Sequence, residues 1–198
     1  IKEFEDFAML APTYKDEKVY KNYEVYTNKS KIESNIGKKF GIKEVDFIDG
    51  TFIVNKNKFD KIGFMDENIF IYFETMDLSK RVIKARDKMY VCDKIKFEHL
   101  GGQSHEVKFN FEASLSRNWH YCWSKFYFLR KHNNYLFAFR KTFPTLVKAC
   151  IKCFKFKLNK NNEKYELHMA EIKGLISAYF LKKSTYRPYV SIKKSFKV

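Results

Sequence analysis

Residues 45–105 read VDFIDGTFIVNKNKFDKIGFMDENIFIYFETMDLSKRVIKARDKMYVCDKIKFEHLGGQSH, and this stretch decides the fold class. Its first ten residues are rich in β-branched and aromatic side chains, which predicts a strand that Gly50 interrupts. A short helix follows and stops at Gly63, and the spacing of apolar residues predicts a second helix over residues 77–88. Another strand over residues 90–100 closes the stretch. Strands that alternate with helices indicate an α/β fold.

The segments on either side extend this pattern differently. Before it, FAMLAP (residues 7–12) predicts a short buried strand that ends at its proline. After it, apolar residues recur every three or four positions over 111–129, which predicts one long helix. A second basic and aromatic helix is predicted over 136–158 with a bend near Pro144, and a third over 164–182. No run of 18 apolar residues is uninterrupted, so no conventional membrane-spanning helix is expected.

The charge of the chain is concentrated in its second half. Residues 1–107 hold 19 Lys/Arg and 19 Asp/Glu, whereas residues 108–198 hold 20 and 4, so the second half carries the whole net charge of +16. This asymmetry favours a polyanionic partner, either nucleic acid or an anionic membrane surface. A tail whose helices simply pack back on the first half, with a solvated basic face, explains the same residues.

The four cysteines do not suggest a disulfide framework in a chain of 198 residues, and a reduced, cytoplasmic setting is the simpler interpretation. Cys150 and Cys153 form a single CxxC pair, but a zinc site would need a second pair of ligands.

Acidic residues gather before the helix at 77–88. A carboxylate such as that of Asp77 is favourable at the start of a helix because it complements the helix dipole. This explanation fits Glu74 less well, because Glu74 follows the apolar run IFIYF and its carboxyl group would lie against apolar surface. Such burial would raise its pKa and suit it to general-base work. His99, at the end of the predicted strand, fits a structural role or a metal ligand.

Three motifs in this order resemble glycosyltransferase family 2, in particular its rhamnosyltransferase-like members. GFMDENIFIYFETMDLSKR (residues 63–81) is similar to the family segment GGFDE-F-F-Y-E-D-x-D-L-x-x-R. KFEHLGGQS (residues 96–104) resembles the family's later strand, which ends in His followed by Gly and Ser. VDFIDGTFIVNKNKFDKIG (residues 45–63) resembles the strand and short helix that come before. The resemblance covers about residues 8–190.

The resemblance implies a GT-A fold and an inverting transfer of a sugar, such as rhamnose, from a nucleotide-diphosphate donor to a surface polysaccharide or a lipid-linked saccharide. It implies a divalent cation, Mg²⁺ or Mn²⁺, on the diphosphate and a carboxylate that deprotonates the acceptor hydroxyl. The basic and aromatic residues of the tail favour a peripheral position at the inner face of the cell membrane, which would suit an enzyme that extends a lipid-linked saccharide. By position in the motifs, the catalytic residues would be Glu74 and Asp77, the metal ligand His99, and the substrate-binding residues Asp49, Gly50, Asp66 and Arg81.

The chain departs from the family pattern in two ways. The usual base position holds Thr75, which cannot take up a proton, so that Glu74 takes the role or the site is inactive. The nucleotide-binding strands and their Asp-x-Asp motif are absent before residue 45. We therefore expect residues 1–107 to be the acceptor-side part of a GT-A domain and residues 108–198 to be a basic helical tail. A noncatalytic module that binds a membrane surface or nucleic acid is the alternative.

Overall fold

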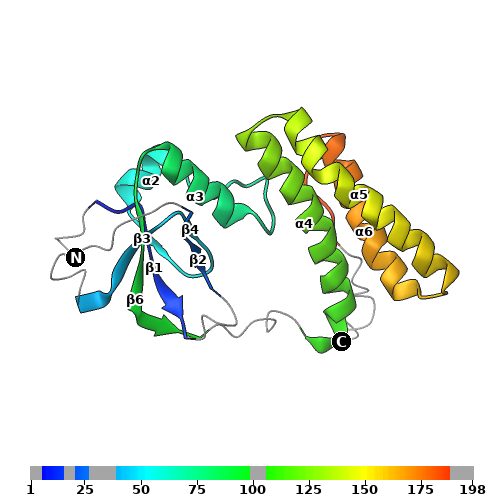
Figure 1. Ribbon diagram of the computed structural model, residues 1–198, viewed down its shortest axis with the longest axis horizontal. Coiled ribbons are helices and arrows are strands. Elements are labelled where there is room, and N and C mark those ends of the chain that lie inside the picture. Colours follow the sequence, from blue (N-terminus) through cyan, green and yellow to red (C-terminus); the bar gives the residue numbers. More distant parts are fainter. Residues whose placement is uncertain (1–5, 16–20, 27–38, 99–105, 188–198) are drawn as a thin grey trace, which may run out of the picture. The chain divides into compact units, whose positions relative to one another are not determined.

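The computed structural model describes residues 6–15, 21–26, 39–98 and 106–187. Contacts between residues divide the chain into two compact units (Figure 1). The first unit comprises Ile1–Asp66 and Glu74–Gly101, and the second comprises Glu67–Phe73 and Gly102–Val198. The seven residues before Glu74 therefore belong to the second unit, although the helix that Glu74 begins belongs to the first.

The first unit is built on a mixed four-stranded sheet in the order β3-β6-β1-β5. Its centre is the parallel pair of β1 (Met9–Tyr14) and β6 (Met89–Phe97). The outer strands β3 (Ile42–Val45) and β5 (Ile53–Val54) run antiparallel to their neighbours. A separate two-stranded ribbon pairs β2 (Tyr23–Glu24) with β4 (Phe47–Ile48). The predicted α/β class is confirmed at this level.

Alternation along β6 builds two apolar layers, because successive side chains of a strand point to opposite faces. Met89 and Val91 join one cluster, together with residues of β1, α2 (Lys56–Ile62) and α3 (Glu74–Lys84). Tyr90 and Cys92 join the other cluster. Burial on both faces fixes the register of β6, since a slip by one residue would exchange the two sets.

Two predicted strands of this unit differ in detail from the structure. The single strand expected over residues 45–54 is divided among β3, β4 and β5, because the chain bends at Asp46 and turns again at Gly50, whose φ is 77°. The predicted strand at FAMLAP begins at Met9 and continues past Pro12 to Tyr14. Pro12 is tolerated because β5 pairs only with Met9 and Leu10, and the ladder to β6 is irregular after Pro12.

The two predicted helices are present in the first unit. α2 begins after Asn55, whose side chain accepts a hydrogen bond from the backbone N–H of Asn57, and it ends at Gly63 as predicted. α3 covers the predicted helix but begins earlier, at Glu74, and ends at Lys84.

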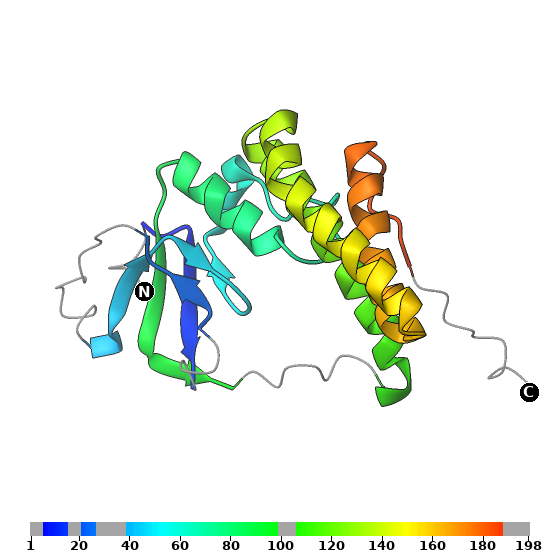
Figure 2. The ribbon, with the colours of Figure 1, turned by 45° about the vertical axis from the view of Figure 1, so that its right-hand side comes forward.

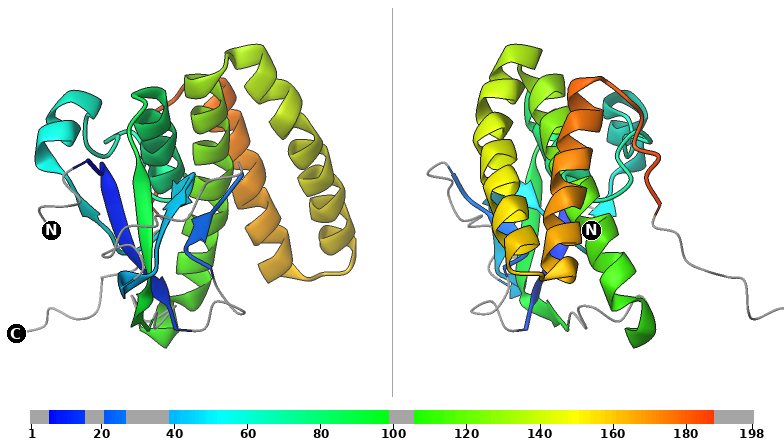
Figure 3. Two further views of the ribbon diagram at one scale, coloured as in Figure 1. Left: turned by 60° about the vertical axis from the view of Figure 1, so that its left-hand side comes forward. Right: turned by 90° about the vertical axis from the view of Figure 1, so that its right-hand side faces the viewer.

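The second unit contains three long helices that pack side by side (Figures 2 and 3). They are α4 (Asn110–His132), α5 (Tyr135–Leu158) and α6 (Asn162–Tyr179), and a short turn η2 (Val107–Phe109) precedes them. Large aromatic side chains of α4 pack against small residues of the other two helices, which allows close approach; the buried members are Trp119, Trp123, Phe126, Ala138, Ala170 and Ala178. All three predicted helices are thus confirmed, and α5 continues through Pro144 as one helix.

Among the described residues, no helix is both long and apolar enough to cross a membrane.

Candidate functional site

Polar residues gather around Gly50 in the first unit, where β4 ends and α3 begins. Asp49 is the organising residue. Its Oδ1 accepts hydrogen bonds from the hydroxyl of Thr75 (2.9 Å) and from the backbone N–H of Gly50 (2.9 Å). Its own backbone N–H donates to the carbonyl of Asn22 (2.8 Å). Two segments that are far apart in the sequence therefore hold Asp49, Thr75 through the carboxylate and Asn22 through the backbone.

Gly50 brings the backbone close to the end of β1. A Cβ atom built on Gly50 would overlap the hydroxyl oxygen of Tyr14. The positive φ of Gly50 also places it in a region that disfavours other residues. Burial, and then the charge of Asp49, raise the pKa of the Tyr14 hydroxyl. The phenol thus stays protonated near neutral pH next to Asp49.

Glu74 is the most perturbed carboxyl group at this position. Burial raises the pKa of Glu74 above its ordinary value, and the nearby charge of Asp49 raises it further, while a hydrogen bond from its own backbone N–H acts in the opposite direction. Its Oε2 is buried and has no hydrogen-bond partner among the residues that the structure describes. The favourable position at the first residue of a helix does not outweigh this burial. The ionised Glu74 side chain therefore adds little to the stability of the fold, and its raised pKa suits it to accept a proton.

The backbone before Glu74 is strained. Tyr72 and Phe73 have φ values of 65° and 67°, and aromatic residues rarely adopt this left-handed region. Each such residue costs on the order of 1–3 kcal/mol, and strain of this kind is concentrated at functional sites.

Asn22 is a second buried polar group at this position that the sequence did not reveal. Its side-chain amide donates to the carbonyl of Pro12 (2.9 Å), and its Oδ1 lacks a described partner. Asn22 and Tyr14 lie outside the motif segments, so no local pattern marks them. Only the pairing of distant strands brings them to Asp49.

Asp77 and Arg81 are joined to each other. The fully buried carboxylate of Asp77 accepts a hydrogen bond from Nε of Arg81 (2.9 Å). The guanidinium group also donates to the carbonyl oxygens of Ile62 (3.0 Å), Gly63 and Phe64. The pair therefore ties the segment after α2 to α3, which gives both residues a structural task beside the catalytic and substrate-binding roles predicted for them.

Asp66 and His99 are the two remaining residues of the predicted site. Asp66 is partly buried two residues beyond the segment that Arg81 holds, and His99 lies outside the described residues. Within the described part of the chain, no group of three or more His, Cys, Asp or Glu residues could hold a metal ion. The predicted cation at His99 stays a prediction.

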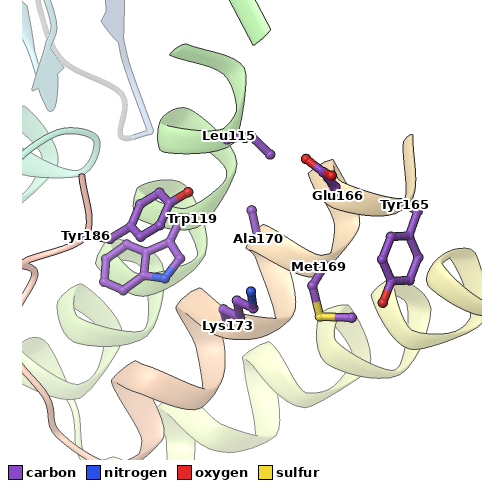
Figure 4. Close-up of a pocket in the computed structure, with 8 residues that line it drawn as sticks. All are labelled: Leu115, Trp119, Tyr165, Glu166, Met169, Ala170, Lys173 and Tyr186. Atoms are coloured by element: carbon purple, nitrogen blue, oxygen red, sulfur yellow. The ribbon is translucent and has the colours of Figure 1, made fainter. Parts of the chain in front are cut away.

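The second unit has a hollow of its own between α4 and α6, with a volume of about 470 Å³ (Figure 4). Trp119 and Tyr186 form a stacked pair at one side, with ring centroids 5.2 Å apart. Glu166 and Lys173 of α6 provide its charged groups. The hollow was not predicted from the sequence, because its wall combines residues of three separate segments.

Comparisons with protein-family models, with curated proteins and with solved structures find no match for this chain.

Proposed function

We propose that the first unit is the acceptor side of an inverting glycosyltransferase, with Glu74 as the general base. The observation that carries this proposal is the half-buried side chain of Glu74, whose Oε2 is buried with no described hydrogen-bond partner and whose pKa is raised by burial and by the charge of Asp49. A general base works best when its pKa is raised toward the operating pH, and burial achieves this for a carboxyl group. The resemblance of residues 45–104 to family 2 supplies the class of reaction.

In the proposed reaction Glu74 removes the proton from an acceptor hydroxyl. The hydroxyl oxygen then forms a bond to the anomeric carbon of the donor sugar, and the bond from that carbon to the diphosphate breaks on the opposite face. The nucleoside diphosphate leaves with the electron pair, and the configuration at the anomeric carbon is inverted. A divalent cation, when bound, would neutralise the departing diphosphate. Glu74 keeps the proton until solvent removes it.

Asp49, Thr75 and Gly50 have supporting tasks in this proposal. The hydroxyl of Thr75 holds the carboxylate of Asp49, and the charge of Asp49 contributes to the raised pKa of Glu74. Thr75 stands at the position where the family usually has the carboxylate of the base. In this chain the hydroxyl of Thr75 would instead orient Asp49. Gly50 leaves room where a side chain would project toward Tyr14.

The test is sugar transfer by the longest protein that the reading frame encodes. A panel of nucleotide-sugars is incubated with Mg²⁺ or Mn²⁺, with and without saccharide acceptors, and release of nucleoside diphosphate is measured. We expect turnover with one donor class and a loss of about 100-fold or more in Glu74→Gln, since general bases contribute factors of this size. Glu67→Gln is the control, because Glu67 is exposed and shows no burial of this kind. A folded protein that turns over no donor would favour the noncatalytic alternative.

A further inference from the structure

The helix α5 turns small residues toward the interior of the second unit and leaves many of its large apolar residues exposed. The residues that it buries within the second unit are small: Ala138, Thr142, Ala149 and Cys153. Their spacing of four, seven and four places them along one face of the helix. Small residues let α5 pack closely, and among its larger side chains Phe139 is partly buried against the aromatic cluster of the unit.

The opposite face of α5 carries large apolar side chains that remain exposed. They recur at intervals of seven, four, four, three and four residues: Leu136, Phe143, Val147, Ile151, Phe154 and Leu158. Ile151, Phe154 and Leu158 are each more than 60% exposed, at 63%, 66% and 66%. At 100° per residue these six positions fall within a narrow stripe that points away from the buried face. The exposed cation Arg140 interrupts this stripe between Leu136 and Phe143, and from Phe143 to Leu158 the stripe is apolar without interruption. An exposed apolar stripe of this length marks an interaction site.

Basic residues accompany this stripe, and acidic residues are absent from it. α5 contains no Asp or Glu and six cations: Arg140, Lys141, Lys148, Lys152, Lys155 and Lys157. Four of the lysines, at 141, 148, 152 and 155, fall along one edge of the apolar stripe by helical position, and all four are exposed. Lys148 and Lys152 line one hollow together with Glu171 of α6, whose carboxylate lies 3.1 Å from Nδ1 of His168.

We propose that the outward face of α5 docks on an anionic lipid surface. An interfacial helix places its apolar side chains at the boundary between headgroups and acyl chains, and its cations at the anionic headgroups. α5 has both features on one side. A second copy of the chain is a poorer occupant because its identical basic rows would repel. Nucleic acid is poorer because four of the six stripe side chains are Leu, Val or Ile, which offer no stacking surface to bases; only Phe143 and Phe154 could stack.

The chain carries a convenient reporter for this face. Cys150 is exposed next to the stripe, whereas Cys92, Cys122 and Cys153 are buried. An environment-sensitive fluorophore on Cys150 should shift to shorter wavelength when the full chain meets vesicles of phosphatidylcholine with phosphatidylglycerol. We expect little change with phosphatidylcholine alone and a loss of the shift at high salt. The Cys150→Ser protein shows whether other thiols are labelled.

Double substitutions distinguish docking through α5 from attraction of the vesicles to the positive charge of the whole second unit. Ile151→Ser with Phe154→Ser should weaken vesicle binding about tenfold or more, and so should Lys148→Gln with Lys152→Gln. The matched controls alter exposed residues of the same unit outside α5, namely Phe180→Ser with Leu181→Ser, and Lys182→Gln with Lys183→Gln. Circular dichroism verifies that each protein keeps its helices.

Three results would overturn the proposal: no binding to anionic vesicles, binding that survives the Ile151 and Phe154 changes, or binding to an oligonucleotide that is tighter than to the vesicles. The proposal does not rest on sugar transfer, because vesicle binding and turnover are measured separately and either can fail alone.

Discussion

At the scale of single residues, the surroundings of Glu74 disfavour its ionised form. Its pKa is raised in the folded protein above the ordinary value of 4.5, chiefly by burial. The folded state therefore binds the proton more tightly than the unfolded state does. As the pH rises from about 4.5 through the raised pKa, the protein must ionise a buried group, and its stability falls.

Glu74→Gln should remove this penalty. Its melting temperature should exceed that of the wild type at neutral pH, and the difference should shrink as the pH approaches 4.5, where wild-type Glu74 is protonated. Thermal unfolding of both proteins across this pH range is the measurement. A variant that melts below the wild type at neutral pH would mean that the Glu74 carboxylate is a structural group and not one held for chemistry.

Gly50→Ala tests the close approach of the backbone to Tyr14. The left-handed backbone alone should cost about 1–2 kcal/mol, and the overlap with the Tyr14 hydroxyl should add to this cost. The control is the same substitution in a Tyr14→Phe protein, which keeps the backbone of Gly50 and lacks the hydroxyl oxygen that the Cβ would overlap. Chemical denaturation should show a larger loss for Gly50→Ala in the wild-type protein than in the Tyr14→Phe protein. Equal losses in the two proteins would exclude the overlap.

The sequence marks some residues of this site through local patterns, whereas others come together only through the fold. Glu74 was identified because a carboxylate after the run IFIYF contradicts the local pattern, and its burial agrees with that expectation. Asp49 and Gly50 were placed near it by the motifs, and the structure joins Asp49 to Thr75. Tyr14 and Asn22 carry no such signal, because strand pairing over long sequence distances brings them to Asp49.

At the scale of elements, α3 is fixed to the end of α2 by Arg81. The side chain satisfies three backbone carbonyl oxygens and the buried carboxylate of Asp77, which has no exposed surface. An unpaired charge in this position is costly because water cannot reach it.

Arg81→Met should therefore destabilise the first unit by about 3–5 kcal/mol, since it removes the cation that compensates the buried charge of Asp77. Lys84→Met, one turn from Arg81 and exposed, should change the free energy of unfolding little. Urea denaturation of both variants measures the difference. The double variant Asp77→Asn with Arg81→Met lacks the buried charge and should be more stable than Arg81→Met alone. If it is not, the buried charge of Asp77 does not cause the loss of stability in Arg81→Met.

The helices were the most predictable elements, because their apolar spacing and their capping residues are local features. α2 illustrates this, with Asn55 at its start and Gly63 at its end. The segment over 45–54 was less predictable, because β-branched residues favour strands without stating with which partner each strand pairs. Likewise, the sequence showed that α5 is apolar and basic, but its packing decided that the large side chains face outward.

At the scale of the whole molecule, the division of charge in the sequence follows the division into two units closely. The excess of cations begins at residue 108, and the second unit takes up the chain from residue 102. We have proposed sugar transfer for the first unit and attachment to an anionic lipid surface for α5 of the second unit. An enzyme that acts on lipid-linked saccharides would need both tasks in one chain, and the two can be tested independently.

The measurement that tests the central claim most directly is acceptor-dependent sugar transfer by wild type and Glu74→Gln, in preparations whose melting temperatures are also recorded. We predict that Glu74→Gln melts at a higher temperature near neutral pH and yet loses about 100-fold or more of the transfer rate. Transfer at the wild-type rate by a folded Glu74→Gln protein would contradict the assignment of Glu74 as the base.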